Sequence, residues 1–257
     1  IHVVEGEDAN MKLTYKEDLY LIEKLFQLKT TDFKTKELTE QESLALRGKV
    51  IVIFGGSSGI GLELLNVCQT RGARTFSFSR HGNHVDIRNP EQVREALQNI
   101  YQQEGRIDYI VNTASVLYKE PLTHMSYAQI DESIDTNYRG MVIVAKESFK
   151  FLQESKGQLL FYTSSSYTRG RMDYTIYSST KCATVNFVQA LSEEWAYANI
   201  RVNCVNPERT KTPMRVKNFG IEPDNTLLDP REVANVTVKV LLSELTGQVV
   251  DVKIKNI

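Results

Sequence analysis

The sequence Lys49–Phe54 (KVIVIF) leads directly into the glycine-rich stretch Gly55–Gly61 (GGSSGIG). A short, nearly unbroken apolar run is typical of a parallel strand that is buried on both faces. Beyond the glycines, apolar residues recur at the spacing of one helix face, among them Ile60, Leu64 and Val67. The succession of strand, glycine turn and helix predicts a site for a phosphate-containing ligand at the helix N-terminus.

Each glycine of this stretch has a predicted role. Gly55 allows the tight turn, Gly59 lets the backbone approach a pyrophosphate, and Gly61 lets the helix pack closely against the sheet. The spacing G-x-x-x-G-x-G differs from the G-x-G-x-x-G of the dinucleotide fingerprint. A sharp turn without any ligand therefore remains the alternative at this point.

Length and composition are those of an ordinary globular protein. The 257 residues suffice for one large domain, or for a domain with part of another. The net charge of −1 gives no electrostatic reason to expect nucleic acid or a membrane as partner. No apolar run approaches the ~20 residues of a transmembrane helix.

The cysteines and histidines indicate neither disulfides nor a metal site. Cys68, Cys182 and Cys204 lie far apart in apolar periodic segments. We expect buried free thiols in a reducing compartment, and hence a cytoplasmic location. The four histidines lack the spacing of metal ligands, so no metal is expected.

Strands and helices alternate along the chain from Lys49 onward. Further strands are expected at 74–79, 107–113, 158–163, 200–205 and 247–254. Helices are expected after caps at Asn89 and Asp229, and over 126–154 and 173–198. This order predicts an α/β fold with a doubly wound parallel sheet, whose ligands bind at the carboxyl ends of the strands.

The first part of the chain does not continue this pattern. Residues 1–6 have the pattern of a strand, and a capping box from Thr14 to Glu17 precedes a helical stripe of leucines. One strand and one helix cannot bury a core alone. Residues 1–30 are therefore predicted to end a second α/β domain, and 31–48 to form a linker with a short helix capped by Thr39.

Tyr177 and Lys181 lie one turn apart on one face of a predicted helix. A free phenol has a pKa of about 10, and a nearby ammonium group favours the phenolate. The pair is therefore a candidate general acid and base. Ser164, at the end of a predicted strand, has a hydroxyl that can hydrogen-bond a carbonyl undergoing reduction, although a serine-rich turn is the alternative.

From about Lys49 to Ile257 the chain resembles the short-chain dehydrogenase/reductase family, which has a Rossmann-type fold. The resemblance rests on motifs in the family's order: Phe54-Gly55-(x)3-Gly59-Ile60-Gly61, Asp86, Asn112-Thr113-Ala114-Ser115, Thr136-Asn137-Tyr138, Ser164, Tyr177-(x)3-Lys181, Asn206-Pro207 and Thr212. Some positions depart from the family pattern. Phe54 replaces a threonine, and Glu208 replaces the glycine after Pro207.

The resemblance implies a catalytic role for four residues. Tyr177 would donate the proton, while Lys181 would tune its pKa and hold the nicotinamide ribose. Ser164 would orient the carbonyl, and Asn137 would hold a water of the proton relay. The resemblance also implies a nicotinamide cofactor bound by Gly55, Ser57, Ser58, Gly59, Ile60, Gly61, Ser79, Arg80, Asp86, Asn112, Ala114, Tyr177, Lys181, Pro207 and Thr212.

The end of the second strand of this domain predicts which cofactor binds. An acidic residue there would hydrogen-bond the ribose 2′-hydroxyl of NAD. This chain has Ser79-Arg80 instead. Serine can donate a hydrogen bond and arginine can pair with a phosphate, which favours NADP(H). A solvated arginine at a strand end is the alternative.

The sequence Asn10-Met11-Lys12-Leu13-Thr14 resembles the end of the cytidylyltransferases that join CTP to a polyol phosphate. This implies that Lys12 contacts a polyol phosphate. The two parts in succession resemble a class of bifunctional bacterial enzymes of capsule and teichoic-acid synthesis. For the reductase, this implies NADPH-dependent conversion of D-ribulose 5-phosphate to D-ribitol 5-phosphate. In the full-length protein, CDP-ribitol would then form from CTP.

A sugar phosphate needs a cationic partner in the site. Arg169 and Arg171 follow Ser164 on its loop, and Lys211 and Arg215 lie in the expected lid, although each can equally be a solvated cation. Two other functions remain open: reduction of another ketone or sugar, and a non-catalytic domain for NADP binding or dimerisation. We expect a small-molecule substrate and a homo-oligomer, either a dimer or a tetramer.

Overall fold

The centre of the molecule is a sheet of seven parallel strands in the order β1-β7-β6-β5-β4-β2-β3. The computed structural model describes residues 12–27, 30–33 and 35–254. The strands are β1 (Thr31–Asp32), β2 (Val50–Phe54), β3 (Arg74–Phe78), β4 (Tyr109–Asn112), β5 (Gln158–Tyr162), β6 (Arg201–Pro207) and β7 (Val249–Val252).

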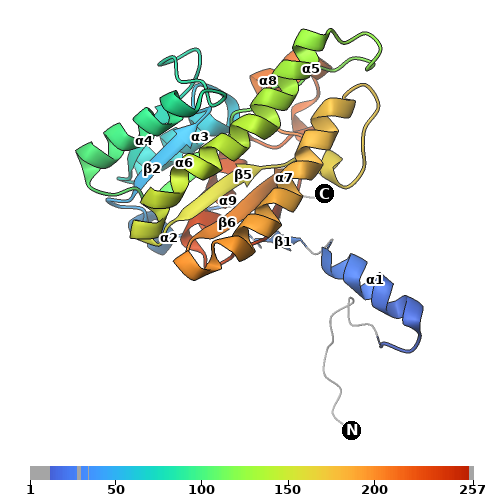
Figure 1. Ribbon diagram of the computed structural model, residues 1–257, viewed down its shortest axis with the longest axis horizontal. Coiled ribbons are helices and arrows are strands. Elements are labelled where there is room, and N and C mark those ends of the chain that lie inside the picture. The colour runs from blue at the N-terminus through green and yellow to red at the C-terminus, as the bar shows by residue number, and fades with distance from the viewer. Residues whose placement is uncertain (1–11, 28–29, 34, 255–257) are drawn as a thin grey trace.

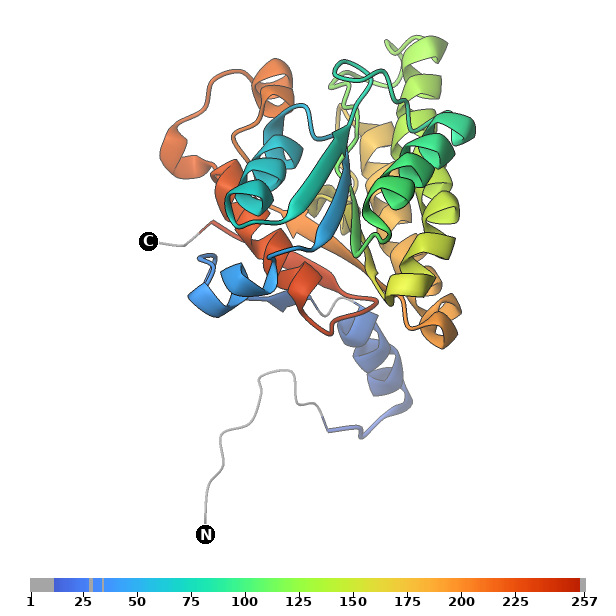
Figure 2. The same cartoon turned by 90° about the vertical axis from the view of Figure 1, so that its left-hand side faces the viewer.

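Helices cover both faces of this sheet (Figures 1 and 2). The helices of the structure are α1 (Lys16–Gln27), which projects away from the sheet, α2 (Glu40–Ala45), α3 (Gly59–Thr70), α4 (Pro90–Glu104), α5 (Tyr127–Ile134), α6 (Gly140–Ser155), α7 (Thr175–Glu194), α8 (Pro213–Phe219) and α9 (Pro230–Leu242). Helices α3 and α9 pack on one face, and α4, α6 and α7 pack on the other. The prediction of a doubly wound α/β fold is confirmed.

The apolar run of β2 explains why the sheet is buried on both sides. Val50, Val52 and Phe54 belong to the core beneath α4, α6 and α7. Ile51 and Ile53 belong to the core beneath α3 and α9. Successive side chains of a strand point to opposite faces, so a strand between two helix layers must be apolar at every position.

The strand order creates a switch point at β2. From β2 the chain first moves outward to β3, and then returns to place β4 on the other side of β2. The connections that leave β2 and β4 therefore run to opposite faces of the sheet, and a crevice opens at the carboxyl ends of these strands.

Two predicted helices differ from the observed ones. The helix predicted over 126–154 consists of α5 and α6, joined by a π-helical turn over Asp135–Arg139. The helix predicted over 173–198 is shorter, because α7 begins at Thr175 and ends at Glu194. Asp173 has a φ of 69°, a left-handed conformation that does not continue a helix.

The start of α1 also differs from its prediction. The amides of Thr14 and Tyr15 donate to the carboxylate of Asp18 at 2.7 and 2.8 Å. The carboxylate that accepts hydrogen bonds from the backbone at the helix start is therefore that of Asp18, whereas the predicted capping box had Glu17 in this role. The helix begins at Lys16, two residues after Thr14. The strand predicted over residues 1–6 lies outside the described residues.

The segment predicted as a linker is attached to the sheet and to α9. Strand β1 pairs in parallel with β7 at the sheet edge. The capping box predicted at Thr39 is confirmed, with Glu42 as its reciprocal acid. Glu42 also accepts two hydrogen bonds from the buried ammonium group of Lys239 on α9, both at 2.9 Å. The domain boundaries themselves stay a prediction.

The cysteine prediction holds in part. Cys68 and Cys204 are buried free thiols, whereas Cys182 is exposed, so the expectation was wrong for this residue. Cys182 follows the buried Lys181 on α7, and adjacent helix positions point in different directions. In the part of the chain that the structure describes, no helix is long and apolar enough to span a membrane.

We predict that Glu42→Ala destabilises the protein by about 1–3 kcal/mol, because it leaves a buried ammonium group without its anion. Lys239 is 5% exposed. Urea denaturation measures the change. Glu40→Ala, on the exposed side of the same helix, is the matched control. Adding Lys239→Met to Glu42→Ala should recover most of the loss. Equal effects of the two glutamate variants would contradict this account.

Candidate active site

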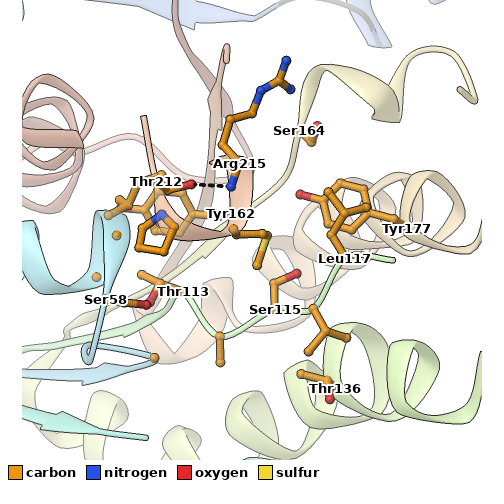
Figure 3. A pocket seen from close by; sticks show the side chains of 18 of the residues that line it. Ser58, Thr113, Ser115, Leu117, Thr136, Tyr162, Ser164, Tyr177, Thr212 and Arg215 are labelled. Atoms are coloured by element: carbon orange, nitrogen blue, oxygen red, sulfur yellow. Dashed lines mark hydrogen bonds between the residues drawn. The ribbon is translucent and has the colours of Figure 1, made fainter. Parts of the chain in front are cut away.

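A cleft of about 920 Å³ opens at the carboxyl ends of the strands. Its walls come from the glycine loop after β2, from the loops after β3, β4, β5 and β6, and from α8 (Figure 3). The cleft lies at the switch point, where a doubly wound sheet binds its ligands.

The glycine loop leaves no space for side chains where it meets β4. Gly55 has a φ of 89°, and a Cβ there would lie 2.5 Å from the amide nitrogen of Ala114. A Cβ on Gly61 would lie 2.5 Å from the Gly55 carbonyl oxygen. Gly59, with a φ of 55°, opens α3 opposite the methyl group of Thr212. This backbone cradle at a helix N-terminus fits the pyrophosphate of a dinucleotide.

The side chains of Ser164 and Tyr177 enter the same part of the cleft (Figure 3). Tyr177 and Lys181 come from α7, and Ser164 follows β5. The Lys181 ammonium group donates to the Tyr162 carbonyl at 2.9 Å and lies 5.4 Å from the centre of the Tyr177 ring. The hydroxyl of the buried Ser166 donates to that of Ser164 at 3.3 Å, which orients Ser164.

The pKa of Tyr177 is shifted in the direction opposite to the expected one. Burial raises this pKa to about 12, although hydrogen bonding with Ser164 acts to lower it. Burial also lowers the pKa of Lys181 to about 8. The Lys181 ammonium group donates to the Tyr162 carbonyl, so its charge does little for the phenol. Tyr177 is therefore protonated at neutral pH, which suits a proton donor.

Asn137 is held by the π-helical turn between α5 and α6. Its Oδ1 accepts from the hydroxyl of Ser115 at 2.9 Å and from the amide of Val116 at 2.8 Å, and its Nδ2 donates to the Val116 carbonyl at 2.9 Å. Asn137 thus fixes the loop after β4. It lines a small cavity that it shares with Lys181, beside the main cleft. Its role toward a water stays a prediction.

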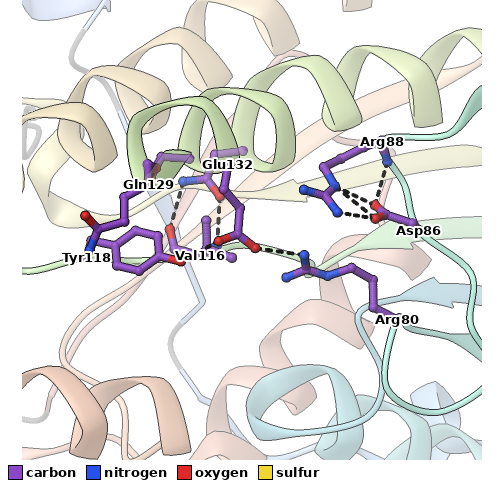
Figure 4. Close-up of polar contacts among 9 residues, drawn as sticks. Arg80, Asp86, Arg88, Val116, Tyr118, Gln129 and Glu132 are labelled. Carbon is purple, nitrogen blue, oxygen red and sulfur yellow. Dashed lines mark hydrogen bonds and ion pairs between the residues drawn. The ribbon is translucent and has the colours of Figure 1, made fainter. Parts of the chain in front are cut away.

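The end of the cleft beside β3 contains two ion pairs (Figure 4). Arg80 donates to Glu132 of α5 at 2.8 Å. Arg88 donates to Asp86, with a shortest contact of 2.6 Å. Partial burial raises the pKa of Asp86, but the hydrogen bonds and charge of Arg88 outweigh it and hold that pKa below its usual range.

The lid over the other end is formed by α8 and the loop after it. Thr212 caps α8 by accepting from the amide of Arg215 at 3.2 Å. The Arg215 guanidinium donates to Glu222 at 2.6 and 2.9 Å and stacks 3.7 Å from the centre of the Phe219 ring. Lys211 pairs with Asp224 at 2.7 Å. Both lid cations considered for the substrate phosphate are thus already paired.

Glu208, which departs from the family pattern, has a structural role. Its carboxylate accepts from the amide of Ile254 at 2.7 Å, just after β7. Its own amide donates to the Val252 carbonyl at 2.9 Å. The glutamate therefore ties the loop after β6 to the end of the neighbouring strand.

The cleft brings together most of the predicted site residues. Its lining includes Gly55, Ser57, Ser58, Gly59, Ile60, Gly61, Ser79, Arg80, Asp86, Ala114, Ser164, Arg171, Tyr177, Lys181, Pro207 and Thr212. Asn112 and Asn137 line the small adjoining cavity. Arg169 and the exposed Lys12 are not among the lining residues of the main cleft.

Sequence reasoning missed several lining residues. Tyr118 and Glu132 lie near Arg80, while Tyr174 and Phe219 form an edge-to-face contact with ring centres 6.0 Å apart near the lid. They belong to no motif, and their spacing in the sequence carries no sign of a site. Among the described residues, no group of three acidic, histidine or cysteine side chains could hold a metal ion.

We predict that the stability of the unmodified protein relative to Lys181→Met rises by about 3 kcal/mol as the pH rises from below 8 to above 10.5. The folded pKa of Lys181, about 8, lies below its ordinary 10.5, so the unfolded chain binds more protons between these values. The unmodified protein therefore gains stability relative to the variant as pH rises through this range. Thermal unfolding of both proteins at several pH values measures the difference. Lys146→Met, at an exposed site, is the control, and a pH-independent difference would contradict the assignment.

Comparisons with known proteins agree with this geometry. A family model described as short chain dehydrogenase matches residues 77–220. The chain is 46% identical, over 257 residues, to the bifunctional ribulose 5-phosphate reductase/CDP-ribitol pyrophosphorylase of Haemophilus influenzae. The match covers 100% of this chain and 54% of that relative, so the chain spans about half of its length. An acetoacetyl-CoA reductase of Acinetobacter is 32% identical over 79% of this chain and 96% of its own length.

Solved structures show the same fold. A 3-ketoacyl-(acyl-carrier-protein) reductase from Brucella melitensis, complexed with NADH, has a TM-score of 0.74 at 22% identity over 80% of this chain and 97% of its own. ElxO with NADP bound has a TM-score of 0.72 at 23% identity, with coverages of 79% and 96%. These findings confirm the fold and a nicotinamide dinucleotide as the cofactor of the family. The chain belongs to the short-chain dehydrogenase family of oxidoreductases.

Proposed function

We propose that this chain reduces D-ribulose 5-phosphate to D-ribitol 5-phosphate with NADPH. The observation that carries the proposal is its 46% identity, from end to end, to the reductase-containing relative from Haemophilus influenzae. The cleft with Ser164, Tyr177 and Lys181 supports a carbonyl reduction of this kind.

The side chains of the site have defined roles in this reaction. NADPH, when bound, supplies a hydride to the ketone carbon. Ser164 donates a hydrogen bond to the ketone oxygen and so fixes its position beside Tyr177. The Tyr177 hydroxyl gives its proton to that oxygen, which completes the alcohol. Lys181, whose ammonium group lies 5.4 Å from the centre of the Tyr177 ring, is assigned to the nicotinamide ribose.

The substrate phosphate needs a cation that is not already paired. Among the described residues, Arg171, Arg209 and Lys217 line the cleft, are exposed and have no carboxylate partner within ion-pair distance. Arg171 lies on the loop that also carries Ser164, and its amide donates to Ser178 at 3.2 Å, which anchors the loop to α7. We therefore assign the phosphate contact to Arg171.

The coupled reaction belongs to the same proposal. In a longer protein of the Haemophilus type, a cytidylyltransferase part would convert the ribitol 5-phosphate product to CDP-ribitol, with Lys12 as a polyol-phosphate contact. We also propose that the product is used for capsule or teichoic-acid type polymers, and that the protein is a cytoplasmic homo-oligomer. A second candidate is the reduction of the ketone of a 3-ketoacyl thioester, because the Acinetobacter relative is named acetoacetyl-CoA reductase.

We predict NADPH oxidation with D-ribulose 5-phosphate, and little with D-ribulose or acetoacetyl-CoA.

Arg171→Ala should raise KM for the phosphate ester about tenfold or more with a smaller change in kcat, because a phosphate contact is made in both the ground and transition states. Arg169→Ala removes the same charge from the same loop, outside the cleft lining, and should change KM little. Tyr177→Phe should abolish turnover. Equal turnover of free ribulose and its phosphate would refute the substrate assignment.

We predict that the protein binds NADPH more tightly than NADH. Loss of a charge-assisted bond to the 2′-phosphate costs about 1.5–3 kcal/mol, so Arg80→Ala should weaken NADPH binding about tenfold or more and leave NADH unchanged. Fluorescence titration with both cofactors measures this. Equal affinities in the unmodified protein would show that Arg80 does not select the cofactor.

A further inference from the structure

Three lining residues from separate parts of the fold form one chain of hydrogen bonds at the end of the cleft beside β3. Nη1 of Arg80 donates to Oε1 of Glu132 at 2.8 Å, and the Tyr118 hydroxyl donates to Oε2 (Figure 4). Arg80 follows β3, Tyr118 follows β4, and Glu132 lies on α5. The residue proposed to bind the 2′-phosphate is therefore already paired with an anion of the same cleft.

The guanidinium group of Arg80 is only partly used by this pair. Among the described residues, its Nε and Nη2 have no partner. A phosphate that took this free edge would share one guanidinium with the Glu132 carboxylate. The side chains of Arg80 and Glu132 are 32% and 25% exposed, so water screens the repulsion between the two anions only in part. A phosphate bound to Arg80 and the Glu132 carboxylate would therefore repel each other and weaken each other's binding to Arg80.

We propose that Glu132 sets the cofactor preference by competing with the ribose 2′-phosphate for Arg80; this inference rests on the proposed use of NADPH. The phosphate, with up to two charges, displaces the single charge of Glu132. The released carboxylate keeps its bond from Tyr118 and is not left without a partner. NADH has no group that displaces Glu132. Glu132 therefore weakens NADPH binding and leaves NADH binding unchanged.

The test is the affinity of the Glu132→Gln variant for both cofactors. Glutamine keeps the size of the side chain but removes the charge that competes. At low salt, Kd for NADPH should fall about three- to fivefold, the upper part of the range for an exposed ion pair, and Kd for NADH should stay within about twofold. Asp131→Asn is the matched control, because it removes the same charge from an exposed neighbouring position on α5. It should change neither Kd.

The same variant in an Arg80→Ala background separates competition from general repulsion. Without Arg80 there is nothing to compete for, so Glu132→Gln should no longer tighten NADPH binding. A persistent gain in that background would overturn the proposal, as would weaker NADPH binding by Glu132→Gln alone, which would make Glu132 a residue that orients Arg80. If Arg80→Ala alone leaves NADPH binding unchanged, the 2′-phosphate does not bind Arg80 and the competition is refuted, whereas the NADPH preference fails only if the unmodified protein binds NADH as tightly as NADPH.

Discussion

The close approach of the glycine loop to the end of β4 is the contact on which the site depends. The amide of Gly55 donates to the Phe78 carbonyl at 2.7 Å, and a Cβ at Gly55 would overlap the backbone of Ala114. Because no side chain fits between these segments, the carboxyl ends of β2 and β4 stay side by side. Helix α3 can then begin directly above them, with its N-terminus toward the crevice, and this helix end is where an anion is bound most favourably.

Buried hydrogen bonds give the catalytic group its geometry. Thr163 donates to the Lys181 carbonyl at 2.8 Å, and the Lys181 ammonium group donates to the Tyr162 carbonyl at 2.9 Å. These bonds hold β5 and α7 in one register, because breaking either would leave a buried polar group unpaired. The same burial that fixes the residues raises the pKa of Tyr177 and lowers that of Lys181. Position and protonation state thus have a common cause.

Some cations of the cleft are paired with carboxylates and others are not. Arg80 pairs with Glu132, and Arg215 pairs with Glu222. Arg171, Arg209 and Lys217 line the cleft without such partners among the described residues. A cleft with unpaired cations near its reacting group favours an anionic substrate. If NADPH binds at Arg80, as proposed, its 2′-phosphate exchanges with the Glu132 carboxylate.

Local periodicity in the sequence was sufficient to predict several elements of the fold and site. The pattern predicted the strand, glycine turn and helix from Lys49 onward, and the alternation of strands and helices along the chain. It also placed Tyr177 and Lys181 on one helix face. Only the tertiary structure decided what surrounds them. Arg80 and Glu132 are 52 residues apart in the chain, β1 joins the sheet through β7 at the far end of the sequence, and Asn137 depends on a π-helical turn that no residue pattern announced. Such contacts follow from how the strands are ordered and the helices packed. The spacing of residues along the chain carries no record of them.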